Sequence, residues 1–73
     1  MAIINHNIEI FIAVAEKLSI TEVSKSLFIS QPAVSKAIKN FEDDLGVQLF
    51  HRNKRMGLVL TNAGERVLKR AYE

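Results

Sequence analysis

Small hydrogen-bonding side chains gather at the start of the segment SQPAVSKAIKNF, residues 30–41. The Gln31 amide can make two hydrogen bonds to the edge of an adenine, and the Ser35 hydroxyl can donate or accept one. Pro32 offers an apolar surface to a thymine methyl, and Lys36 can reach a guanine or a phosphate. These residue types suit recognition rather than chemical transformation. Taken alone, Gln31 and Ser35 could be ordinary exposed polar residues. At the start of the second helix of a helix-turn-helix, these residues predict contacts to base edges in the major groove of double-stranded DNA.

A second set of side chains can bind the phosphates that border such a groove. Lys39 lies further back on the same segment, and we expect it to meet a phosphate. Ser19, Thr21 and Ser30 are expected first as helix caps and second as phosphate contacts. Backbone contacts of this kind position a protein on DNA, whereas base contacts read the sequence.

Basic residues are concentrated in the C-terminal part of the chain. Residues 1–47 hold four lysines against six acidic residues, whereas residues 48–73 hold six basic residues against two acidic ones. A basic segment favours a polyanionic partner, although solvated basic faces are common. We expect Arg52, Lys54 and Arg55 to contact DNA phosphates or the minor groove. The alternatives are a solvated turn and, for Arg52, an ion pair with an acidic residue at a helix end.

The sequence carries no catalytic or metal-binding pattern. It has no cysteine, no Gly-x-Ser-x-Gly elbow, no phosphate-binding glycine loop and no His-Glu zinc motif. His6 and His51 lack ligand-spaced partners, and the acidic run at 42–44 lacks the loop spacing of a calcium site. We therefore expect no enzyme activity, no metal and no cofactor. No stretch approaches the roughly 18 apolar residues of a membrane span, so a soluble, cytoplasmic protein is expected. The predicted DNA contacts add the expectation that it associates with the nucleoid.

Two helices must precede the segment that begins at Ser30, in a chain of only 73 residues. Apolar residues from Ile4 to Leu18 recur at spacings of three and four, which predicts an amphipathic first helix. Ser19 with Glu22 three residues later is a capping-box pattern and starts a short second helix. The residues of this second helix that are expected to face the core are Val23, Leu27 and Phe28.

A third helix follows almost at once, with Ser30 as its cap. Pro32 is tolerated in the first turn, because the amide that proline lacks has no intrahelical partner there. Gly46 can take the left-handed conformation that ends the helix. The residues expected in the core, on this helix and just beyond it, are Val34, Ile38, Phe41, Leu45, Leu49 and Phe50.

The last third of the chain predicts a hairpin and a fourth helix. Two segments rich in β-formers, 48–52 and 58–61, flank a polar turn at 53–57 that contains a glycine. Thr61 or Asn62 then caps a helix with an acidic first turn and a basic last turn. The fold class predicted from this order is mostly α with a small β-hairpin: a winged helix-turn-helix with a three-helix core, a wing and a C-terminal linker helix.

The chain resembles the DNA-binding domain of LysR-type bacterial transcriptional regulators over nearly its whole length. The segments FIAVAE, SITEVSKSLFISQPAVSKAIKNFEDDLGVQLF and LTNAG stand in the family's order and spacing. The resemblance implies a DNA-binding winged helix-turn-helix at 1–60 and the start of a linker or dimerisation helix at 61–73. It implies that helix 31–43 enters the major groove and that the wing at 51–57 lies on the backbone or the minor groove. It implies DNA contacts for Gln31, Pro32, Ser35, Lys36 and Arg52.

Two positions depart from the family pattern in ways that matter physically. Leu18 stands where a glycine often ends the first helix, so the usual left-handed end of that helix is in question. Lys36 stands where an arginine is frequent, and a lysine lacks the planar fork that binds a base in two places. We expect a relaxed base preference at that position.

An apolar stripe on the fourth helix predicts a homodimer. Part of the stripe must cover the first helix, and the remainder has no partner within the chain. The residues expected at the dimer contact are Val67, Leu68 and Ala71. A two-fold dimer would bind an inverted-repeat operator, and a higher oligomer is expected for a full-length protein.

The ligand-sensing domain that follows in the family is absent, and the chain stops inside a helix, which suggests a fragment or an isolated domain. The alternative function is a winged helix used for contact with another protein. That alternative keeps the fold but does not require a small polar leading edge together with a basic wing.

Overall fold

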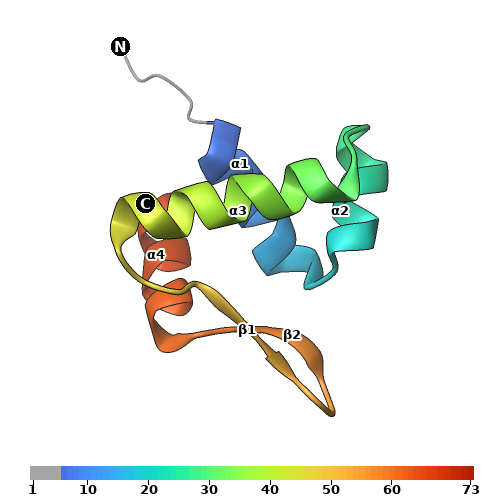
Figure 1. The fold of residues 1–73 in the computed structure, drawn as a ribbon. Helices are drawn as coiled ribbons and strands as arrows, with labels where there is room; N and C mark the ends of the chain where they lie inside the picture. The colour runs from blue at the N-terminus through green and yellow to red at the C-terminus, as the bar shows by residue number, and fades with distance from the viewer. Residues whose placement is uncertain (1–5) are drawn as a thin grey trace.

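The computed structural model describes residues 6–73, which form four helices and a two-stranded sheet (Figure 1). In chain order the elements are α1 (His6–Lys17), α2 (Ile20–Leu27), α3 (Gln31–Leu45), β1 (Phe50–Asn53), β2 (Gly57–Leu60) and α4 (Asn62–Tyr72). This order confirms the predicted fold class. α3 extends two residues beyond the predicted 31–43, and the predicted contribution of Ile4 to the first helix lies outside the described residues.

The core lies where α1, α2 and α3 meet, with one aromatic residue at its centre. Phe11 is fully buried, and its ring centroid lies 5.5 Å from that of Phe41 and 5.6 Å from that of Phe50. Aromatic pairs at such distances are favourable beyond the area they bury. Phe11 therefore joins α1 to α3 and to the first strand. The predicted core residues that are buried are Val23, Val34, Ile38, Phe41, Leu49 and Phe50.

Short polar side chains begin three of the helices, as predicted. The Ser19 hydroxyl accepts a hydrogen bond from the Glu22 amide at 3.1 Å, and the Ser30 hydroxyl accepts one from the Ala33 amide at 3.1 Å. Thr61, rather than Asn62, caps α4 and accepts from the Gly64 amide at 2.9 Å. Each bond satisfies one of the amides that a helix leaves without a partner at its start.

Three residues predicted to lie in the core are exposed instead. Leu27 is 39% exposed, Phe28 is 94% exposed and Leu45 is 44% exposed. Leu27 and Leu45 are the last residues of α2 and α3, where the neighbouring helices no longer cover them. Phe28 follows α2 in a left-handed backbone conformation, with a φ of +58°. Helical spacing therefore does not carry its side chain to the core face.

The end of α1 is left-handed although no glycine stands there. Leu18 has a φ of +53°, and its amide donates to the Val14 carbonyl at 2.6 Å. A branched residue adopts this conformation only when the surrounding structure imposes it, because its β-carbon crowds the backbone. Leu18 therefore differs from the usual glycine in its side chain but keeps the left-handed backbone conformation. The chain turns between α1 and α2 within two residues.

The hairpin is antiparallel, with Phe50 opposite Leu60 and Arg52 opposite Leu58. Its turn is held by Asn53, whose side-chain oxygen accepts from the Arg55 amide at 2.8 Å and from the Met56 amide at 3.1 Å. Such a local bond closes a turn without a backbone partner. The predicted hairpin is confirmed, but its strands span 50–53 and 57–60 rather than 48–52 and 58–61, which leaves a turn of three residues, 54–56.

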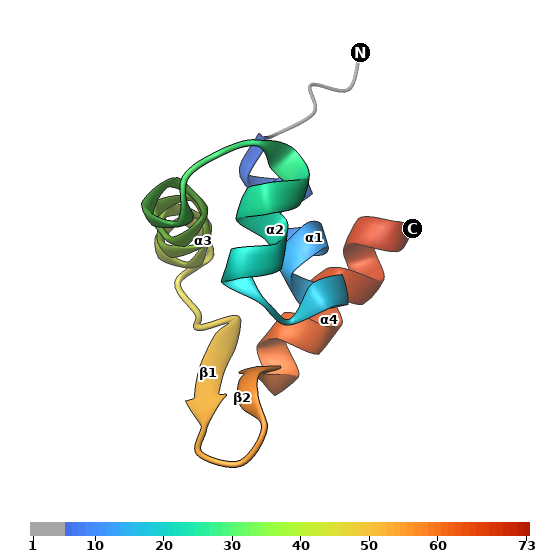
Figure 2. The ribbon, with the colours of Figure 1, turned by 90° about the vertical axis from the view of Figure 1, so that its right-hand side faces the viewer.

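Figure 2 looks along α3 and shows the hairpin projecting away from the helices, with α4 on the far side of α1 from α3. α4 packs against α1 and β2. The N-terminal end of α3 and the tip of the hairpin therefore extend from the same body and can face one partner. Among residues 6–73, no helix is long and apolar enough to cross a membrane.

Candidate nucleic-acid interface

The first two turns of α3 carry the side chains that were predicted from the sequence to contact bases. Gln31, Pro32, Ser35 and Lys36 are all exposed, whereas Val34 between them is fully buried. The buried residues hold the helix against α1 and α2, so its outer face is a fixed array. The proline sits in the first turn, where it costs no hydrogen bond. All four predicted base-contacting residues thus lie on the exposed side of α3, with Gln31 and Ser35 beside the wing and Lys36 beside α1.

A hollow joins this face to two other parts of the molecule. Its lining comes from the α1–α2 junction, the start of α3 and the hairpin. Five of its residues were predicted as contacts from sequence, namely Ser19, Thr21, Gln31, Ser35 and Arg52. Side chains that are more than thirty positions apart in the chain therefore surround a single concave, solvent-open surface.

The hairpin supplies the predicted cations at its exposed end. Arg52 lies on β1 and lines the hollow beside Ser35, while Lys54 and Arg55 lie in the exposed turn. Within residues 6–73 the ion pairs are His6–Glu9 and Lys39–Asp43, so Arg52 does not pair with an acidic residue at a helix end. Its guanidinium remains available to an anion.

The hairpin also places in the hollow three residues without polar side chains, Met56, Gly57 and Leu58. Met56 is 75% exposed, although it is apolar. The sequence identified the turn as basic and therefore drew attention to its charged members only. The position of Met56 follows from the Asn53 turn, which composition does not reveal.

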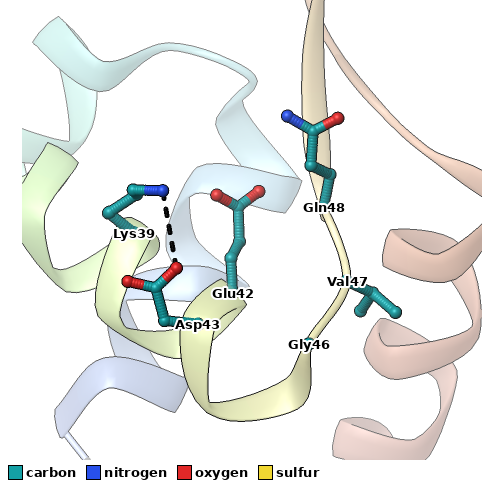
Figure 3. A pocket seen from close by; sticks show the side chains of 6 residues that line it. All are labelled: Lys39, Glu42, Asp43, Gly46, Val47 and Gln48. Carbon is teal, nitrogen blue, oxygen red and sulfur yellow. Dashed lines mark ion pairs between the residues drawn. The ribbon is translucent and has the colours of Figure 1, made fainter.

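Lys39 is engaged on its own helix. Its ammonium lies 3.4 Å from a carboxylate oxygen of Asp43, one turn further along α3 (Figure 3). Both side chains are largely exposed, and an exposed pair of this kind contributes little to stability. A phosphate oxygen can replace Asp43 as the partner at small cost, so the pair is compatible with the predicted phosphate contact.

The capping hydroxyls can bind an anion without giving up their caps. Ser19 and Ser30 each accept one backbone hydrogen bond, and the hydroxyl hydrogen is left to donate. For Ser19 and Ser30 the two predicted roles are therefore compatible. The predicted cap at Thr21 is wrong, because Ser19 caps α2 and Thr21 lies inside its first turn, exposed to solvent. The free amides at the start of a helix favour an anion at the same place, so a phosphate contact is the role that Thr21 keeps.

The residues predicted at a dimer contact divide between two environments. Val67 and Leu68 are half-buried and pack against the core, whereas Ala71 is exposed. Val67 also lines an open, mainly apolar groove between α3 and α4, together with Leu45 and Val47. At the end of α4 the Tyr72 hydroxyl donates to a carboxylate oxygen of Glu16 at 2.5 Å, which raises the pKa of Tyr72 above its usual value.

Neither the histidines nor the acidic run forms a metal site in the part of the chain that the structure describes. Asp43 is paired with Lys39, and Glu42 turns away from it toward the segment that leads into β1 (Figure 3). The hydrogen bonds of Glu42 are contacts that the sequence did not predict, because Glu42 was considered as part of the acidic run at 42–44 and of the family motif, and neither assigned a partner to its side chain.

The fold and this surface define a winged helix-turn-helix protein. The sequence model described as "Bacterial regulatory helix-turn-helix protein, lysR family" matches residues 6–65, and the chain belongs to that family. A relative from Bacillus subtilis (strain 168), named as the uncharacterized HTH-type transcriptional regulator YoaU, is 58% identical over 64 residues. That match covers 88% of this chain and 22% of the relative. The chain thus spans about a fifth of the length of curated relatives that it matches.

Solved structures agree with this assignment. A LysR-family transcriptional regulator from Eggerthella lenta DSM 2243 superposes with a TM-score of 0.83 at 36% identity, covering 96% of this chain and 97% of that one. A structure titled as a BenM_DBD/catB site 1 DNA complex superposes with a TM-score of 0.82 at 33% identity, covering 90% of this chain and 73% of that one. The predicted family and fold are confirmed.

Proposed function

We propose that this chain binds double-stranded DNA sequence-specifically, as the DNA-binding part of a bacterial transcriptional regulator. The observation that carries the proposal is the hollow in which the start of α3, the α1–α2 junction and the wing converge. The likeness to a domain whose solved structure is titled as a DNA complex supports it. We assign no enzymatic role, and we place this activity in the bacterial cytoplasm.

In this proposal α3 enters the major groove with its N-terminal end first. Gln31, Pro32, Ser35 and Lys36 face the base edges, since all four are exposed on one side of a helix whose other side is buried. The small size of the first three side chains lets the helix backbone approach the bases. Lys36 supplies a cation at the edge of this face.

The wing and the caps hold the DNA backbone. Arg52 stands in the hollow without an acidic partner, and Lys54 and Arg55 extend beyond it in the exposed turn. The residues assigned to phosphate or minor-groove contacts are Ser19, Thr21, Ser30, Lys39, Arg52, Lys54 and Arg55. Because these contacts displace counterions from the DNA, the affinity must fall as salt rises.

We further propose that two chains pair through α4 on an inverted-repeat operator. Ala71 is exposed at the end of the helix, and Val67 lies in an open apolar groove. Residues 1–60 would then act as the reading unit and residues 61–73 as the start of a linker helix. A higher oligomer in a longer protein and association with the nucleoid remain predictions.

Selection from a random duplex library is the direct test, because it does not require the operator sequence to be known. The chain is immobilised, bound duplexes are amplified and sequenced, and the enriched duplex is titrated at increasing salt. We expect an enriched inverted repeat and an affinity that falls linearly on a log–log plot against salt. Equal recovery of all sequences, together with an affinity that does not change with salt concentration, would contradict the proposal and favour a winged helix that binds protein.

A further inference from the structure

Glu42 connects the recognition helix to the wing through its side chain. One of its carboxylate oxygens, Oε2, accepts a hydrogen bond from the Leu49 amide at 2.7 Å and another from the Phe50 amide at 3.3 Å. The carboxylate lies on α3, and the two amides lie where β1 begins. Figure 3 shows the side chain reaching from the helix toward the segment after Val47. A charged acceptor makes these bonds stronger than ordinary ones.

The backbone of the same residue holds the connecting segment as well. The Glu42 carbonyl accepts from the Gly46 amide at 2.8 Å and from the Val47 amide at 3.3 Å, which ends α3. One residue thus receives hydrogen bonds from four amides within residues 46–50, the segment that leads to the wing. The connection leaves little freedom for the wing to turn about the helix.

The opposite side of this segment is held too. Thr61 donates from its amide to the Leu49 carbonyl at 3.0 Å and from its hydroxyl to the Gln48 carbonyl at 2.7 Å. Leu49 is fully buried and Phe50 nearly so. The start of β1 is therefore fixed by its side chains and from two sides by hydrogen bonds. Glu42 supplies the bonds that come from α3.

We propose that Glu42 is a positioning residue, which sets the direction of the wing relative to the recognition helix so that both contact one DNA duplex. The inference rests on the proposed function and deepens it. Arg52, Lys54 and Arg55 follow closely after Phe50 in the chain, so a change of direction there displaces all three cations from the phosphates. Glu42 itself touches no DNA in this arrangement.

The test combines a change at Glu42 with removal of the wing cations. Glu42→Asp keeps the charge but shortens the side chain, so that it no longer reaches both amides. In the parent, the double substitution Lys54→Ala and Arg55→Ala should flatten the plot of log affinity against log salt by about two units. In the Glu42→Asp background the slope should already be lower, and the same double substitution should change it by less than about half a unit.

Two further variants separate positioning from charge and from general stability. Glu42→Gln keeps the length of the side chain and one acceptor oxygen. In this background the double wing substitution should change the salt slope almost as much as it does in the parent. Asp43→Asn removes the neighbouring charge, which pairs with Lys39, and should leave that effect unchanged. Base preference on the selected duplex should be the same in all folded variants. A full effect of the wing substitutions in folded Glu42→Asp would overturn the inference.

Amide hydrogen exchange gives a readout that needs no DNA. In the parent, the amides of residues 49–60 should be protected, and Glu42→Asp should speed their exchange about tenfold or more while those of α1 keep their rates. If the parent fails to bind any duplex, the proposed function fails, and exchange still decides the role of Glu42. Uniform acceleration throughout the chain would show a purely structural role and would also overturn the inference. If Glu42→Asp does not fold, Glu42→Met, which has similar length and no acceptor, takes its place in both measurements.

Discussion

At the scale of single residues, α3 alternates exposed side chains that are proposed to contact bases with buried side chains that hold the helix against the core. Ser35 is exposed and its neighbour Val34 has no exposed surface, so adjacent positions on α3 serve opposite purposes. The anchor fixes the backbone, and the backbone fixes where the next side chain points. Readout by so short a side chain depends on that fixed placement, because a serine cannot reach across a gap.

Replacement of Gln31 by alanine tests base reading at this scale. Gln31→Ala should reduce discrimination at one base pair by about 1–3 kcal/mol, because the two hydrogen bonds to an adenine edge are lost. Competition titrations with duplexes that differ at single positions would measure it. Asn40→Ala is the matched control, because its amide lies further along the same helix and about half a rotation away. Equal weakening of selected and random duplexes by Gln31→Ala would show that Gln31 reads no base.

At the scale of elements, local chemistry predicted where helices start and also that Gly46 ends α3 in a left-handed conformation, but it did not predict which residues near the helix ends are covered. Ser19, Ser30 and Thr61 cap helices as the sequence indicated, because a cap needs only a hydroxyl and an amide three residues away. The exposure of Leu27 and Leu45 could not be read from spacing, since it depends on how far the neighbouring helices extend. The hydrogen bonds of Glu42 join two different elements, and no sequence pattern indicated them.

The candidate DNA-binding site was likewise predicted only in part from the sequence. Gln31, Ser35 and Arg52 were singled out from residue type and family motif, and the structure gathers them around one hollow. That they share the hollow with Met56 depends on the Asn53 turn and on the register of Arg52 against Leu58. Neither is encoded in composition or spacing.

The turn between α2 and α3 carries a strain that can be removed. Phe28 adopts a φ of +58° and is almost wholly exposed, so its side chain contributes little packing. Phe28→Gly should raise the free energy of unfolding by up to about 1 kcal/mol, because glycine takes this conformation without a steric penalty. Urea denaturation followed by circular dichroism measures the change. Ser26→Gly, inside α2, should lower it by about 0.5–1 kcal/mol. Equal loss in both variants would show that Phe28 is unstrained.

The wing should contribute affinity rather than sequence choice. Lys54→Ala and Arg55→Ala, made singly, should each flatten the plot of log affinity against log salt by about one unit, because each removes one phosphate contact. Base preference on the selected duplex should stay unchanged. Lys25→Ala, which removes an exposed lysine near the end of α2, serves as the comparison. A slope unaltered by either wing substitution would mean that the turn points into solvent.

At the scale of the whole molecule, hydrogen bonds at both ends of α4 join this helix to the rest of the domain. Its first turn is joined through Thr61 to the start of the wing, and its last turn through Tyr72 to Glu16 on α1. Gly64 lies so close to the Leu49 carbonyl that a β-carbon added there would overlap the carbonyl oxygen. The direction of α4 relative to the rest of the domain is therefore fixed, and in the proposed pairing this direction sets how two chains meet.

Pairing through α4 should control binding to a full operator but not to a half-site. Ala71→Glu places a charge in the proposed contact and should weaken binding to an inverted repeat by about tenfold or more, with the half-site affinity lowered far less. Sedimentation with and without duplex should show two parent chains on each full site. Asn62→Glu adds the same charge on the opposite side of α4 and should leave the stoichiometry unchanged. One parent chain per full site at saturating protein would rule the pairing out.

The close approach at Gly64 fixes the position of α4 relative to the segment that leads into the wing. A helix advances about 1.5 Å and rotates about 100° for each residue. In the proposed pairing, one residue inserted after Glu65 would rotate Ala71 by more than a quarter of a circle about the helix axis. It would also move Val67 and Leu68 off the core and separate Tyr72 from Glu16. The partner's recognition helix would then meet the wrong side of the duplex. Seven inserted residues, close to two whole turns, would bring it back to nearly the same side but about 10 Å further out. In the proposed dimer, the position of the pairing residues along α4 thus sets the spacing between operator half-sites, so a differently spaced operator would require no change in a base contact.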